Sequence, residues 1–242
     1  MLKKIILTTV SVLLGGYMIF VLTYLAIRPN TEECKGTNIE ITGDDYGVLT
    51  NKDIEEMLSH KNLAPTGRLM TEIDCSMIEN AINEYSLIDE CQCYKTHKNL
   101  IGIRINCKKP IMQVFDKHEK MFYIDHEGNI IEGVSCAIYL PVASGFIDRS
   151  MAGKELLKIA TFLQENRFWN EQIEQIYFTP KGEAVLIPRV GNHTIEIGKA
   201  ENIDEKLHKL KEFYTKGLNK IGWNKYNKLN IEFDGQIIGT KR

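Results

Sequence analysis

The densest group of side chains with catalytic potential is Asp125-His126-Glu127, and His118-Glu119 lies shortly before it. A histidine between two carboxylates can exchange protons or bind a metal ion. The segment continues as Gly128-Asn129, however, and Asp, Gly and Asn are favoured in tight turns for backbone reasons. We therefore expect residues 125–129 to form a solvated turn between two strands.

Known catalytic patterns are missing from the rest of the chain. The sequence contains no GxSxG, P-loop, GxGxxG or HExxH pattern. His60, His97, His193 and His208 are isolated from one another in the sequence. We expect no enzyme activity, no metal and no cofactor. The alternative is a membrane-anchored envelope enzyme that acts on peptidoglycan or glycans through residues 125–127.

Six cysteines could take part in redox chemistry: Cys34, Cys75, Cys91, Cys93, Cys107 and Cys136. An oxidising compartment would permit disulfides, but the sequence cannot choose among the possible pairings. Cys91 and Cys93 are two residues apart on an expected strand, so they share a face and pair poorly with each other. Buried free thiols are the other interpretation, and we favour it slightly.

The N-terminal region predicts a membrane anchor. Residues 5–27 carry no charge, follow Lys3-Lys4, and at about 1.5 Å per residue could cross a hydrocarbon core of roughly 30 Å. The positive-inside rule puts the tail, residues 1–4, in the cytoplasm and residues 28–242 outside it. A cleaved signal peptide is the alternative. The net charge of −2 argues against a nucleic-acid partner.

After a polar linker, 28–37, residues 38–109 predict a first domain. Strands are expected at 38–41, 88–94 and 100–107, and helices at about 51–60 and 75–85. Thr50 or Asn51 would cap the first helix, and Ser76 with Glu79 would form a capping box on the second. The order β-α-α-β-β predicts a small sheet with two helices on one face.

Residues 110–242 predict a second domain. Short strands are expected at 111–115, 121–124, 130–131, 137–141, 173–178, 184–188 and 194–197. Helices are expected at about 153–166 and 205–218, the latter capped by Asp204. The fold class is α+β, with a mostly antiparallel sheet that carries its helices on one face.

The segment 229–242, LNIEFDGQIIGTKR, allows two structures. Leu229, Ile231 and Phe233 alternate with polar residues, which is typical of a half-buried strand. Asp234-Gly235 is a strong signal for a two-residue hairpin. The arm after it is short and would bury little as a hairpin, so one strand at the open edge of a sheet is the alternative.

Several short strings, in the same order along the chain, resemble the FtsQ/DivIB family of bacterial cell-division proteins, in its Bacteroidetes branch. These strings are KPI at 109–111, FYIDHEG at 122–128, LPVASG at 140–145, FW at 168–169, IEQI at 173–176, LIPRVG at 186–191 and KLHKLKEFY at 206–214. The resemblance covers the whole chain and implies a POTRA domain followed by a β domain. The high cysteine count departs from the family pattern.

The resemblance implies a scaffold of the divisome without catalysis. Such a protein sits in the inner membrane with a periplasmic body, is enriched at the septum, and links early and late division proteins. Its POTRA domain and transmembrane helix contact other divisome membrane proteins, and its β domain captures the FtsB–FtsL pair. A chaperone for outer-membrane assembly is a weaker alternative, because such proteins usually carry several POTRA units.

The resemblance also implies one continuous last strand that is bent at Gly235, and a binding site at which the partner adds a strand to it. The matching residues are Asn230, Ile231, Glu232, Phe233, Asp234, Gly235, Gln236, Ile237 and Ile238. An edge strand offers unpaired N–H and C=O groups that a partner strand can satisfy. Charges at this edge could equally guard it against pairing.

Overall fold

The computed structural model describes residues 2–27, 32–43, 46–134, 138–233 and 235–242. Helix α1 covers Leu2–Ile27, and its side chains are described from Val10 to Tyr24. Among the described residues, none of the helices combines the length and the apolar character needed to cross a membrane. The anchor expected at residues 5–27 stays a prediction.

The first sheet has the predicted β-α-α-β-β order. Its elements are β1 (Gly36–Thr42), α2 (Asn51–His60), α3 (Cys75–Asn83), β2 (Ile88–Lys95) and β3 (Leu100–Cys107). The sheet order is β1-β3-β2, in which β3 pairs in parallel with β1 and antiparallel with β2. Alternate isoleucines of β3 are buried against apolar side chains of α2 and α3, as the period of two predicts.

The ends of this first unit differ in detail from the expectation. β1 begins at Gly36, two residues early, and Cys34 is already buried in the core. Thr50 caps α2 in a reciprocal capping box with Asp53. Asp74, and not Ser76, caps α3, because the Asp74 carboxylate accepts the Ser76 N–H at 2.9 Å.

The second sheet has nine strands in the order β12-β11-β10-β9-β8-β7-β4-β5-β6 within the described residues. The strands are β4 (Pro110–Phe115), β5 (Met121–Asp125), β6 (Ile130–Ile131), β7 (Val142–Gly145), β8 (Ile173–Phe178), β9 (Ala184–Pro188), β10 (Thr194–Gly198), β11 (Tyr226–Asn230) and β12 (Ile238–Lys241). The sheet is mixed, because β7 pairs in parallel with β4 and β8, and β10 pairs in parallel with β11. Residues 138–141 form no strand, and residue 137 lies outside the described part.

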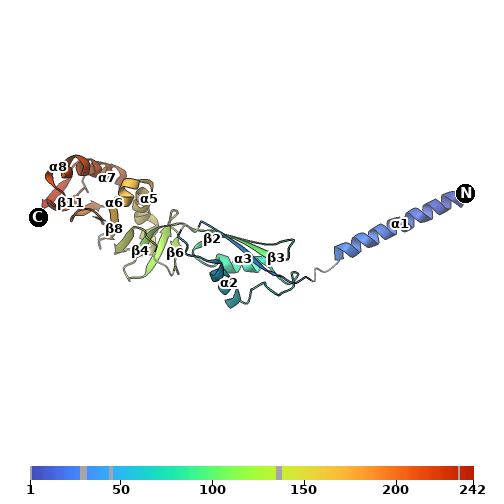
Figure 1. Cartoon of the computed structure of the whole chain (residues 1–242). Coiled ribbons are helices and arrows are strands. Elements are labelled where there is room, and N and C mark those ends of the chain that lie inside the picture. The colour runs from blue at the N-terminus through green and yellow to red at the C-terminus, as the bar shows by residue number, and fades with distance from the viewer. Residues whose placement is uncertain (1, 28–31, 44–45, 135–137, 234) are drawn as a thin grey trace.

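Helices lie along one side of this second sheet (Figure 1). One helical segment consists of α4 (Arg149–Met151), a π-helical turn (Ala152–Leu156) and α5 (Leu157–Glu165), followed by α6 (Arg167–Gln172). The other consists of α7 (Ile203–Glu212), a π-helical segment (Phe213–Leu218) and α8 (Asn219–Ile221). Leucines and isoleucines of α5 and α7 complete the main core over the strands. Asn202, and not Asp204, is the residue at the start of α7.

A separate apolar cluster joins the two sheets. Leu87, which precedes β2, packs with Tyr123, Ile131, Val134 and Ile138 of the second unit. This cluster covers the outer end of the second sheet, where the two-residue strand β6 forms the edge. Figure 1 accordingly places β6 beside the first sheet and β11 at the opposite end.

Hydrogen bonds reinforce this junction. The Ser86 hydroxyl donates to the Glu132 carbonyl at 2.6 Å and accepts the Glu132 N–H at 2.8 Å. The Lys108 N–H donates to the Leu87 carbonyl at 2.8 Å. The hydroxyl thus satisfies both backbone groups of Glu132, so the junction combines apolar burial with hydrogen bonds between the units.

We expect Ile131→Ala to lower the free energy of unfolding by about 2–4 kcal/mol, because it deletes a fully buried side chain at the junction. Denaturant titration of the full chain measures this change. Ile221→Ala is the matched control, since this side chain is 42% exposed, and it should change stability by less than about 0.5 kcal/mol. Equal effects of the two variants would show that the cluster does not hold the junction.

Candidate partner-binding edge

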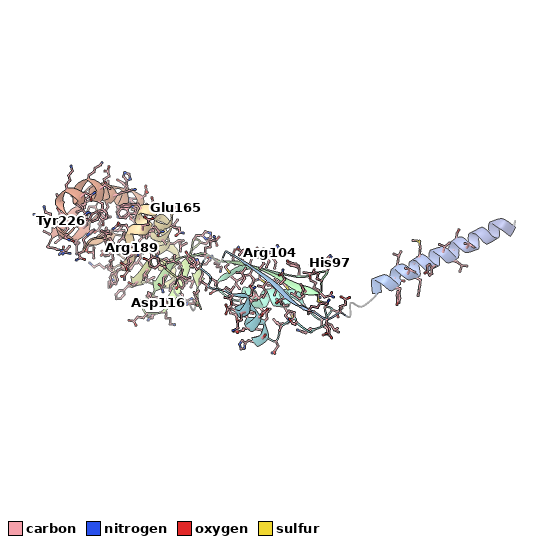
Figure 2. All side chains as sticks on the ribbon, viewed as in Figure 1. His97, Arg104, Asp116, Glu165, Arg189 and Tyr226 are labelled. Carbon is pink, nitrogen blue, oxygen red and sulfur yellow. The ribbon has the colours of Figure 1, made fainter. Side chains whose placement is uncertain are left out.

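Strands β11 and β12 form an antiparallel hairpin at the edge of the sheet away from the first unit. Within the described part of the chain, β12 pairs with β11 alone, and all four of its residues are exposed. In Figure 2, Tyr226 on β11 accordingly lies at the far end of the second sheet, away from Arg104 on β3. β12 is therefore an open edge with free hydrogen-bonding capacity.

The hydrogen bonds of β11 indicate which groups of β12 face outward. The Ile231 N–H donates to the Glu196 carbonyl of β10 at 2.8 Å. Because N–H groups alternate sides along a strand, those of Asn230 and Lys228 face β12.

The register pairs these two β11 residues with Ile238 and Thr240, the first and third residues of β12. The second and fourth, Gly239 and Lys241, therefore direct their backbone N–H groups outward.

The hairpin is held by close packing on Tyr226. The Tyr226 ring lies over Gly239, where a Cβ atom would come within 2.6 Å of a ring carbon. The Tyr226 ring also lies near Phe213, with 6.2 Å between the ring centroids. Gly239 thus lets the ring bridge the edge strand and the last helical segment.

The residue after β12 is tied back to the domain. The Arg242 guanidinium donates to the Asn192 carbonyl at 2.8 Å, and the Arg242 N–H donates to the Lys225 carbonyl at 3.3 Å. Asn192 precedes His193, which is buried and lies 2.6 Å from the Tyr214 hydroxyl through Nε2. The segment that holds Arg242 is thus next to a buried histidine–tyrosine pair.

Two effects change the pKa of His193. Burial, and then the positive charge of Arg242, lower it below its ordinary value of 6.5. Burial also raises the pKa of Tyr214. Both groups are thus neutral at physiological pH, and the Tyr214 ring packs edge-on against Trp223 at 4.9 Å. Trp169 and Trp223 are core and helix-end anchors in this region.

The prediction of one continuous strand through Gly235 is wrong, and so is that of a two-residue turn. β11 ends at Asn230, because the Asn230 side-chain oxygen accepts the Glu232 N–H at 2.9 Å and turns the chain away from the ladder. The connection runs from 231 to 237 and includes Gly235 with a φ of +82°. β12 begins only at Ile238.

The nine expected binding residues are therefore spread over three environments. Asn230 lies in β11, and Ile231 is buried in the main core. The connecting residues include exposed Glu232, Phe233, Gly235 and Gln236 and half-buried Ile237, while Asp234 lies outside the described residues. Ile238 alone of the nine is on β12, where it is 47% exposed.

Sequence reasoning missed Gly239, Thr240 and Lys241, which form most of the open edge. The alternation of β-branched Ile238 and Thr240 with Gly239 and Lys241 is a weak strand signal. It is too short to be distinguished from a disordered end. The edge becomes evident only from the pairing of β12 with β11.

The group at residues 125–129 forms the predicted turn. The Asp125 carboxylate is buried and accepts N–H groups of Glu127 and Asn129 at 2.9 and 2.8 Å. The side chains of His126 and Glu127 are 72% and 68% exposed. Among the described residues, no group of His, Cys, Asp or Glu could hold a metal ion. The catalytic alternative therefore has no support at this position.

The fold defines a two-part α+β protein: a POTRA-like unit followed by a mixed sheet with one open edge. A family model described as a POTRA-like domain matches residues 32–106. A second family model, described as FtsQ/DivIB, C-terminal related, matches residues 109–240, which is more than half of the chain. The chain thus belongs to the FtsQ/DivIB family of cell-division proteins, which are generally non-enzymatic. A comparison with curated proteins finds no match.

Because the pKa of His193 is lowered in the folded state, we expect stability to fall as the pH decreases. Above 6.5 the histidine is neutral in both states, whereas below it the unfolded chain binds a proton first. The loss continues down to the folded-state pKa and then stops. Denaturant titrations between about pH 7.5 and 5.5 measure this slope.

The matched variants are His193→Phe and Arg242→Gln. His193→Phe should reduce the slope by removing the titrating group. Arg242→Gln should also reduce it, because loss of the cation brings the pKa of His193 closer to its ordinary value. A slope unchanged in both variants would contradict this assignment.

Proposed function

We propose that this protein is a non-enzymatic scaffold that links early and late division proteins at the septum. The membership of the FtsQ/DivIB family supports the division role. The protein captures the FtsB–FtsL pair by strand addition to the open edge of β12. Support for strand addition comes from β12 itself, whose four residues are all exposed at the edge of a nine-stranded sheet.

Strand addition suits the chemistry of this edge. The outward N–H and C=O groups of Gly239 and Lys241 need partners that an extended segment supplies. Phe233, which is 52% exposed on the adjoining connection, offers an apolar contact beside the strand. Main-chain hydrogen bonds would then provide affinity, and Phe233 with Ile238 would contribute specificity.

The proposal also places residues 28–242 in the periplasm, anchored in the inner membrane by residues 5–27. The support is the uncharged sequence of that segment and the lysines before it. The POTRA-like unit and the anchor would contact other divisome membrane proteins. The apolar junction at Leu87, which packs the two units together, would set the position of the β12 edge relative to those contacts.

The first test compares Lys241→Pro with Lys241→Ala in the full chain. Proline removes the outward N–H of Lys241 and is tolerated on edge strands, whereas alanine keeps the N–H and removes the charge. We expect Lys241→Pro to weaken binding of the co-expressed FtsB–FtsL pair by about 10-fold or more, and Lys241→Ala to change it little. Biolayer interferometry measures both affinities, and far-ultraviolet circular dichroism checks the fold. Equal affinities of the two variants would disprove backbone pairing at this edge.

The second test places a charge at the apolar contact. Phe233→Glu should abolish binding of the FtsB–FtsL pair while the protein stays folded, because a carboxylate would have to be buried beside the partner strand. Gln236→Glu is the control, since it adds the same charge to an exposed position of the same connection. The same affinity measurement is used. If Phe233→Glu binds as well as the wild type, the partner does not cover this connection.

A further inference from the structure

Three cysteines of the POTRA-like unit converge between α3 and β2. Cys75 is the first residue of α3 and is half-buried. Cys91 and Cys93 lie two residues apart on the buried face of β2, as the period of a strand requires. All three thiols are free in this structure.

Cys75 and Cys93 face each other where α3 packs on β2. Cys75 packs against the buried cluster that contains Cys93, and it lies on the same side of α3 as Glu79, four residues further on. A second contact fixes the helix against the strand at the same point, because the Glu79 carboxylate of α3 accepts the Cys93 N–H at 2.7 Å. The geometry thus brings residues from different elements together, unlike that of Cys91 and Cys93 on a single strand.

We propose that Cys75 and Cys93 form an oxidisable pair, which becomes a disulfide when the chain meets a disulfide oxidant. Cys91 is excluded as the partner of Cys93 by its position two residues away on the same strand. Whether the bond forms in cells depends on the proposed periplasmic location of this domain. Its chemistry in the purified protein does not depend on that proposal.

The reaction with a small-molecule disulfide such as oxidised glutathione is balanced. The Cys75 thiolate, the more accessible of the two, attacks one glutathione sulfur, and one glutathione thiolate leaves. The Cys93 thiolate then attacks the Cys75 sulfur of this mixed disulfide and releases the second glutathione thiolate. The two cysteines lose two electrons and two protons in total, and one oxidised glutathione becomes two reduced molecules.

The surroundings support selectivity for this pair. Cys75 is half-buried whereas Cys91 and Cys93 are buried, so a disulfide oxidant in solution reaches Cys75 first. Burial raises the pKa of Cys91 to about 12, so its thiol stays protonated. Burial raises the pKa of Cys93 as well, so the second exchange is slow at neutral pH. The bond would tie α3 to β2, which is an edge strand of its sheet.

Mass spectrometry of the full chain tests the pair. The protein is incubated with oxidised glutathione at about pH 8.5, where more thiolate forms, then alkylated and digested with trypsin and a glutamyl endopeptidase. These enzymes separate residues 73–79, which contain Cys75, from residues 91–95. We expect these two peptides to be linked, with fragmentation showing the bond at Cys93 and the alkyl group at Cys91.

The controls separate the pair from its neighbours. Cys91→Ser should keep the link, and Cys75→Ser should abolish it. Oxidation should raise the midpoint of thermal unfolding by roughly 10 °C in the wild type and leave it unchanged in Cys75→Ser. A bond at Cys91, a lasting mixed disulfide on Cys75, or a link that forms only in denaturant would overturn the proposal. None of these outcomes bears on binding at β12.

Discussion

The architecture depends on the apolar cluster that closes one end of the nine-stranded sheet. An open sheet has two edges, and each edge exposes unpaired backbone groups. Here the β6 edge is only two residues long and lies under the cluster around Leu87 and Ile131. The cluster therefore both joins the two units and leaves β12 as the open edge of the larger sheet.

The smaller sheet shows a different solution to the same constraint. On β2, the outward N–H of Cys93 is occupied by the Glu79 carboxylate of the adjacent helix. A strand partner would have to displace this charged acceptor before it could pair there. No such side chain hydrogen bond covers Gly239 or Lys241 among the described residues. The β2 edge of the small sheet is thus blocked at Cys93 by a side chain, whereas the β12 edge of the large sheet is open in the described part of the chain.

Local patterns were sufficient to predict most elements. The alternating isoleucines of β3 and the cap at Thr50 depend only on neighbouring residues, and both agree with the structure. The turn that begins at Asp125 follows from turn chemistry in the same way, although the Asp125 carboxylate itself is buried. The fold class of the first unit could therefore be derived from its sequence alone.

The candidate site could not be derived to the same extent, because it depends on contacts between distant residues. The end of β11 is set by the side chain of Asn230, whose choice between the ladder and a turn is not visible in the alternation. The juxtaposition of Cys75 and Cys93 likewise requires α3 to be placed on β2. His193 finds its partner, Tyr214, on another element. Such pairings are determined by tertiary packing, not by sequence spacing.

The parallel pairing of β10 with β11 makes the edge strand depend on non-local contacts. Parallel neighbours cannot be joined by a tight turn, so the chain between β10 and β11 runs through the helical crossover from Ile203 to Ile221. In the described part of the chain β12 pairs with β11 alone, so it joins the sheet only through β11. These non-local contacts cost loop-closure entropy, and we expect the docking of the β11–β12 hairpin on β10 to be slow compared with the formation of local turns.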